Sequence, residues 1–217
     1  MKGYKAVIVL VILTIIAQLF ANVANWVTPL IFEALDIYDG HIWLGISTNI
    51  IYLVSKLLLF VAYGTAAFGL PQGDKCKIPF VVLAVSCLFG VILNIGNIAA
   101  NIYSFATENI PTAWYGITGA TSLFTTTLSM VGLIWLAVAV RSIPLRITSI
   151  VFAISQMAIT LFYIFVSPDF WHYIYNSGSE KALLILYNAV TFIIDFGPEL
   201  LFFAALIHFA QSLKVRN

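Results

Sequence analysis

Long apolar stretches alternate with short polar breaks along the whole chain. A membrane-spanning helix needs about 20 mostly apolar residues, and six stretches are long enough: 6–32, 42–70, 79–105, 113–140, 145–167 and 182–212. The breaks between them carry charged and turn-forming residues, and a proline stands at four points where a helix should begin or end. The pattern predicts an all-α polytopic membrane protein, with residues 1–217 forming a single bundle of six transmembrane helices.

The charges in the breaks alternate in sign from one side of the predicted membrane to the other. Basic residues precede the first span, separate spans two and three, bracket the turn between spans four and five, and follow span six. The other three breaks carry six acidic residues and a single lysine. Because loops that face the cytoplasm are enriched in Lys and Arg, we expect both termini to be cytoplasmic and the chain to be a multi-pass protein of the plasma (cytoplasmic) membrane.

Composition supports a lipid environment and removes several classes of function. Hydrophobic residues make up 62% of the chain and charged residues only 9%, whereas a soluble domain has about a quarter charged residues. The lipid bilayer is therefore the expected partner, and a net charge of +1 gives no reason to expect nucleic-acid binding. The two cysteines lack metal-site spacing, and no hydrolase or phosphate-loop motif is present. We expect no metal, no cofactor, no catalytic residue and no enzymatic activity.

Every predicted span carries polar residues at helical spacing, three, four or seven positions apart. Small and hydroxylated residues of this kind are common at helix contacts in membranes, and we interpret the Ser/Thr face of the fourth span as packing. Side-chain amides are harder to place at a dry contact, because each brings two donors and an acceptor. The amides of the first, third and sixth spans therefore favour a hydrated cavity bounded by those three spans, although packing stays an alternative.

Three charged residues lie near the middle of predicted spans. Lys56 is in the second span, and Asp195 and Glu199 are one turn apart in the sixth, with Pro198 between them. A charge at the bilayer centre costs about 2.5–3.5 kcal/mol on insertion scales, and pairing lowers that cost. We therefore expect Lys56 to pair with one of the two acids and spans two and six to be adjacent. One acid is left over, and it is protonated, solvated in a cavity or neutralised by a bound cation. A proline in mid-span also favours a kinked or broken helix, as in many transporter sites.

Two functions fit this arrangement. The first is a small permease, channel or substrate-binding membrane unit for a small polar or cationic solute or a proton. The second is a non-catalytic accessory or sensory subunit of a membrane complex, in which the charged residues only hold helices together. Either can assemble as a homo-oligomer or with a partner subunit. The candidate binding residues are Lys56, Asp195, Glu199, Asn94, Asn97, Asn188, Asn22 and Gln18.

Two segments near the C-terminal half resemble a known family. They are GLIWLAVAVRSIPLRITSI (132–150), in which a span ends and restarts around Arg-Ser-Ile-Pro, and FGPELLFFAALIHFAQSLK (196–214), a last span that runs into a basic tail. Together they resemble a family of six-span bacterial integral membrane proteins known as a domain of unknown function. The resemblance implies six spans and a bacterial or archaeal membrane. It implies no activity and no site residue.

Overall fold

The part of the chain that the structure describes folds into six long helices. The computed structural model describes residues 3–34, 40–107, 112–165 and 180–215, and these contain no strand. Each of the six helices is long and apolar enough to cross a membrane, which confirms the prediction of an all-α polytopic protein with six spans. The helices are α1 (Gly3–Ala34), α2 (Gly40–Gly69), α3 (Lys77–Thr107), α4 (Thr112–Ala139), α5 (Ile143–Phe165) and α7 (Glu180–Val215).

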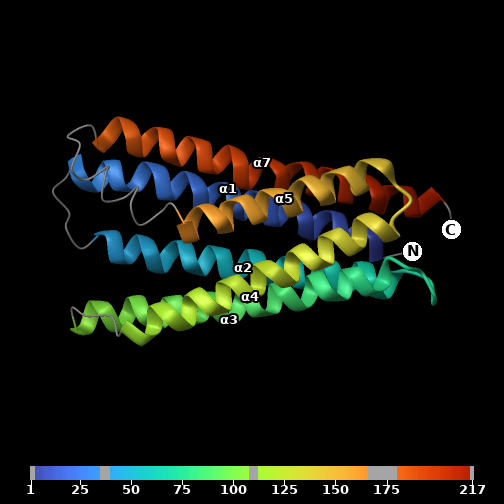
Figure 1. Ribbon diagram of the computed structural model, residues 1–217, viewed down its shortest axis with the longest axis horizontal. Coiled ribbons are helices and arrows are strands. Elements are labelled where there is room, and N and C mark those ends of the chain that lie inside the picture. The colour runs from blue at the N-terminus through green and yellow to red at the C-terminus, as the bar shows by residue number, and fades with distance from the viewer. Residues whose placement is uncertain (1–2, 35–39, 108–111, 166–179, 216–217) are drawn as a thin grey trace.

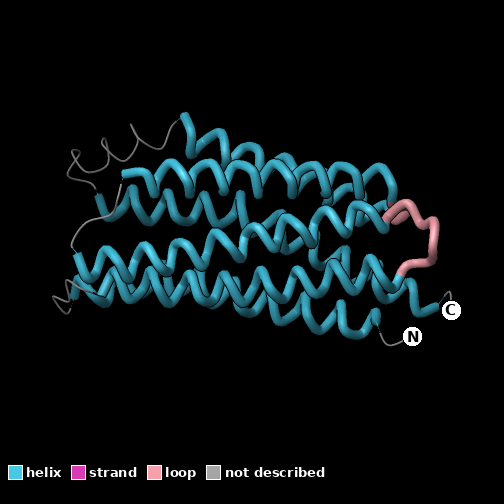
Figure 2. The backbone as a smooth tube through the Cα atoms, turned by 90° about the horizontal axis from the view of Figure 1, so that it is seen from below, coloured by secondary structure: helices cyan, strands magenta, loops and turns pink. Residues whose placement is uncertain are grey.

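The helices form a closed ring in chain order. Each one packs against the next, and α7 completes the ring by packing against both α5 and α1. The helices run along one common axis (Figure 1, Figure 2). The prediction that spans two and six are neighbours is wrong, because α1 and α5 occupy the two positions beside α7 and α2 is not its neighbour in the ring. Residues of α2 and α7 therefore meet only across the interior.

Two short turns show why the helices end where the sequence predicts. In the turn between α2 and α3, Gly73 has a φ of 85°, a conformation that glycine adopts without strain. The Asp74 carboxylate then accepts the Cys76 backbone N–H at 2.8 Å and so supplies a partner at the start of α3. In the turn between α4 and α5, the Arg146 guanidinium donates to the Val140 carbonyl at 2.9 Å, which satisfies a carbonyl at the end of α4.

The apolar core fills the ring at the end where both termini lie (Figure 1). Aromatic rings make up much of it. Phe80 of α3 lies 6.3 Å from the Tyr63 ring of α2 and 6.4 Å from the Phe209 ring of α7, measured between ring centroids. Phe152 of α5 lies 5.6 Å from Phe202 of α7. The contact between Phe80 and Phe209 crosses the interior from α3 to α7, and the other two join neighbouring helices, so that together they close this end of the ring. That this end faces the cytoplasm stays a prediction.

The outer surface of the ring is apolar. Phe68, Val138 and Ile193 are 82%, 78% and 68% exposed. Exposed apolar side chains of this size are compatible with a surrounding of hydrocarbon, where they cost nothing. The chain is therefore apolar outside, apolar inside at the end with the termini, and polar inside farther along the helices, where the cavity described below lies.

Candidate functional site

A cavity of about 300 Å³ lies inside the ring, next to the core. Five of the six helices contribute side chains to it, where the sequence predicted contributions from spans one, three and six. The structure brings together six of the eight candidate residues, along with one tyrosine, one glutamine and two phenylalanines. The lining consists of Gln18 and Asn22 from α1, Tyr52 and Lys56 from α2, Asn94 from α3, Phe152 and Gln156 from α5, and Asp195, Phe196 and Glu199 from α7.

A chain of hydrogen bonds crosses the cavity wall from α7 through α1 to α2. The Gln18 side-chain amide donates to Glu199 Oε1 at 3.0 Å. The Asn22 side-chain amide donates to the backbone carbonyl of Gln18 at 2.9 Å, and the Tyr52 hydroxyl donates to Asn22 Oδ1 at 3.3 Å. A hydrogen bond to a charged group is worth more than a neutral one, so Gln18 is the residue that fixes the Glu199 carboxylate on this side of the ring.

Lys56 reaches the cavity along α3 and makes no close ion pair. A Cβ placed on Gly90 would meet the Lys56 Cγ and Cδ atoms at 3.3 Å, so this glycine leaves the room in which the aliphatic stem lies. Lys56 lines the cavity together with both Asp195 and Glu199. Among the described residues, however, no N···O distance from Lys56 to Asp195 or Glu199 is within 4.0 Å. The prediction of a Lys56–acid ion pair is therefore wrong, because α1 lies between α2 and α7 in the ring.

Two amide oxygens in the cavity wall have no donor. They are Gln18 Oε1 and Gln156 Oε1, both of which are buried and lack a hydrogen-bond partner in the described part of the chain. The Gln18 side chain is only 4% exposed. A buried acceptor without a partner costs about 1–3 kcal/mol, and native proteins rarely leave one in this state. Both glutamines line the cavity, so water or a bound molecule in the cavity can supply a donor after a small rotation of the side-chain amide.

Helix α7 passes the two acids without interruption, although Pro198 lies inside it. The expectation of a broken helix is therefore wrong. Proline has no backbone N–H, so the carbonyl four residues earlier, that of Ile194, has no helical donor. This carbonyl immediately precedes Asp195. The turn thus places an additional backbone acceptor next to one of the two carboxylates.

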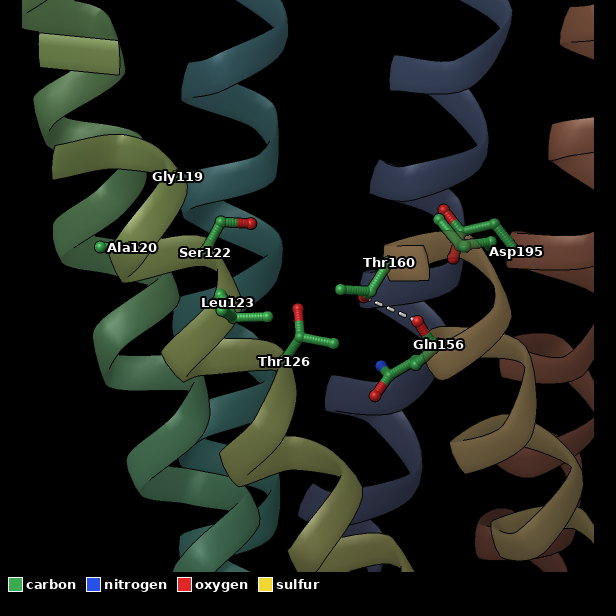
Figure 3. Close-up of a pocket in the computed structure, with 9 residues that line it drawn as sticks. Gly119, Ala120, Ser122, Leu123, Thr126, Gln156, Thr160 and Asp195 are labelled. Carbon is green, nitrogen blue, oxygen red and sulfur yellow. Dashed lines mark hydrogen bonds between the residues drawn. The ribbon is translucent and has the colours of Figure 1, made fainter. Parts of the chain in front are cut away.

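Two further pockets adjoin the cavity, and all three share Gln156. A small one of about 80 Å³ lies toward the core and includes Lys56, Glu199 and Cys87. A larger one of about 600 Å³ lies between α4 and α5 and is also lined by Asp195 (Figure 3). Hydroxyl residues from the polar face of α4 line these two pockets, so that face borders open space in addition to packing against neighbouring helices.

Two candidate residues lie elsewhere. Asn97 lines none of the three pockets, and Asn188 belongs to α7 but its side chain lies outside the described residues. Gln156 and Tyr52 were not among the predicted site residues, although both line the cavity. Both belong to sets of polar residues that recur three, four or seven positions apart in the fifth and second spans, and this spacing is the signal that indicates them. An amide or phenol in mid-span needs a partner just as much as the asparagines do.

The fold and the cavity define this chain as a polytopic helical membrane protein with a charged interior. Within the described residues no group of three His, Cys, Asp or Glu side chains is placed to hold a metal ion. Comparison of the chain with protein-family models, with curated proteins and with solved structures finds no match. The resemblance to the six-span bacterial family stays a prediction, and any function must be argued from the cavity itself.

Proposed function

We propose that this protein is a small permease or substrate-binding membrane unit, and that its cavity binds a small cation that carries N–H donors. The observation that carries the proposal is the composition of the cavity wall. Two carboxylates, Asp195 and Glu199, face one ammonium, that of Lys56. Two buried amide oxygens, on Gln18 and Gln156, lack donors. A cationic donor supplies both things that the wall lacks, positive charge and N–H groups.

The size and chemistry of the cavity favour a small organic cation over a proton alone. A volume of about 300 Å³ is at the lower end of the range for small-molecule sites. A proton on one carboxyl neutralises the excess charge, but it cannot donate to Gln18 Oε1 and Gln156 Oε1 as well. An ammonium group has three donors, enough for a carboxylate and two amide oxygens.

The alternative of an accessory subunit, with charges that only hold helices together, receives less support. That function depends on a close ion pair between Lys56 and an acid. Among the described residues the pair is not formed within 4.0 Å. A carboxylate without an ion pair is costly inside a membrane unless water, a hydrogen bond or a ligand solvates it. Glu199 has one hydrogen bond, from Gln18, Asp195 is exposed, and the cavity that both line provides space for a solvating molecule. The geometry therefore fits a binding site better than a structural contact.

Ligand-induced stabilisation of the purified protein tests the proposal. Methylammonium should raise the melting temperature of the protein in detergent, and the effect should saturate, because a ligand that binds only the folded state stabilises it. Tetramethylammonium, which has the same charge and no N–H, should have a much weaker effect. Asp195→Asn and Glu199→Gln should each lose the methylammonium response. Asp74→Asn, an equivalent change in the turn before α3, should keep it.

No saturable response to methylammonium in the wild type, or a full response in both cavity variants, would overturn the proposal. If the response is present, uptake of methylammonium into liposomes that contain the protein distinguishes a permease from a unit that only binds. Uptake that is lost in Asp195→Asn supports the permease.

A further inference from the structure

The pocket between α4 and α5, which we call the flank pocket, also reaches α7. It has a volume of about 600 Å³ and ends at Asp195 (Figure 3). The two helices diverge from the turn that joins them (Figure 1), and small residues, Gly119 and Ala120, line the pocket on the α4 side. A Cβ on Gly119 would meet no atom within 4 Å. The space between the helices is therefore left unfilled at this point.

Several residues that line the pocket on α4 are exposed at the surface of the protein. Gly119, Ala120 and Ser122 are exposed, and Leu123 is 47% exposed. In a bilayer this flank is next to lipid chains. The pocket thus leads from the hydrocarbon side of the ring to a carboxylate, since Asp195 lines both this pocket and the inner cavity.

The walls of the pocket are amphipathic. Leu123 and Ile159 provide apolar contact. The Thr160 hydroxyl donates to the backbone carbonyl of Gln156 at 2.8 Å, so it is satisfied within its own helix. At the inner end stand Asp195, which has no ion pair among the described residues, and Gln156 Oε1, which has no donor. A ligand that fits both the polar inner end and the apolar walls of the pocket has a cationic N–H head and an apolar tail.

From this arrangement we infer that the ligand of the site is an amphiphilic primary ammonium compound, which enters sideways from the membrane between α4 and α5. Its head lies against Asp195 and Gln156, and its alkyl tail lies in the flank pocket beside Leu123 and Ile159. This inference rests on the proposed function, since it assigns the class of cation that the cavity binds and the route by which it arrives.

A series of alkylammonium ions tests the inference. Calorimetric titration of the detergent-purified protein with methyl-, propyl- and hexylammonium should show an affinity that rises with chain length, at most about fourfold per methylene if each one is fully buried. Hexanol, which has the same tail and no charge, should not bind. Gly119→Phe should fill the pocket and reduce hexylammonium affinity at least tenfold while leaving methylammonium affinity within twofold. Gly116→Phe, one turn away on α4, is the matched control and should bind both amines as the wild type does.

The outcomes separate this inference from the proposed function. If methylammonium binds but affinity does not rise with chain length, or if Gly119→Phe leaves hexylammonium binding intact, the flank pocket does not hold the alkyl tail. The inference is then wrong, and the cation site stands. If no amine binds the wild type, both are wrong. Adding phosphatidylethanolamine to the micelles identifies the source of the ammonium group. Competition with hexylammonium indicates a lipid headgroup, whereas the absence of competition indicates a free amine; phosphatidylglycerol serves as the control lipid.

Discussion

Replacing Lys56 by methionine distinguishes a binding cavity from a structural ion pair. The change removes the ammonium and keeps most of the aliphatic stem that lies against Gly90. It therefore isolates the charge from the packing, which alanine would not do. The two functions considered for this chain predict different losses of stability.

The expected loss follows from the distances. Breaking a close buried ion pair costs about 3–5 kcal/mol. Here Lys56 is more than 4.0 Å from both carboxylates, and the space between them is a cavity. With water-like screening, two unit charges at 4 Å interact by about 1 kcal/mol, and removing the ammonium also removes its own desolvation cost. We therefore expect Lys56→Met to lower the free energy of unfolding by about 1 kcal/mol.

The same change should strengthen cation binding. Lys56 is the positive charge that competes with a ligand for Asp195 and Glu199. Its removal should improve methylammonium affinity by about fivefold, equivalent to about 1 kcal/mol. Unfolding in mixed micelles by titration with sodium dodecyl sulfate measures stability, and calorimetry measures affinity. Lys75→Met, an exposed lysine in the turn before α3, is the control and should change neither.

A stability loss of 3 kcal/mol or more would refute this reasoning. It would show that Lys56 and an acid act as a structural pair, and that the cavity does not screen them. A weaker affinity for methylammonium would refute the second part, because it would place Lys56 among the groups that bind the ligand.

Two further predictions concern packing and a thiol outside the cavity. Gly96→Ala should lower the free energy of unfolding by about 1–3 kcal/mol, because the new Cβ would lie 2.6 Å from the Trp114 ring. Gly116→Ala is the control, and it should be neutral or stabilising in the same denaturation assay because a Cβ there meets no atom within 4 Å. Equal losses of stability in the two variants would contradict the close contact between Gly96 and Trp114. Burial, and then the adjacent Asp74 carboxylate, raise the pKa of Cys76 to about 11, so the folded state favours the protonated thiol. Alkylation of Cys76 by iodoacetamide should therefore be slow at pH 8, where about 0.1% of the thiol is ionised. The stability that the protonated thiol contributes should be lost as the pH rises from about 9 to 11. Rapid alkylation of Cys76 in the folded protein at pH 8 would contradict that assignment.

The six helices and much of the cavity wall are predictable because two periodicities are visible in the chain. Apolar runs of membrane-spanning length give the helices. Spacing of three or four residues shows which polar side chains share a face, and so places Gln18 with Asn22, and Asp195 with Glu199. A polar face inside lipid must turn toward other protein, so these residues were expected to meet in the interior, and the structure brings them there.

The order of the helices around the ring was not predictable in the same way. The position of a residue in its span gives its depth in the membrane but not its direction around the ring. Lys56 and the two acids have similar depths, which suggested contact. The separation between them depends on α1 and α5 packing beside α7, and on Gly90 directing the lysine stem along α3. Neither feature leaves a signal in the local pattern of one sequence.

The division of the interior into an aromatic core and a polar cavity has a consequence for any transport cycle. The core and the cavity share Phe152, which lines the cavity and packs against Phe202 of the core, whereas the polar residues of the cavity lie outside the core. Phe80, which is fully buried, contacts Phe209 across the interior and closes the end with the termini. The flank pocket reaches Asp195 without passing this core. A ligand that enters between α4 and α5 can therefore bind with the core intact. Its release toward the termini would require the α3–α7 contact to separate, so binding and release would depend on different parts of the ring.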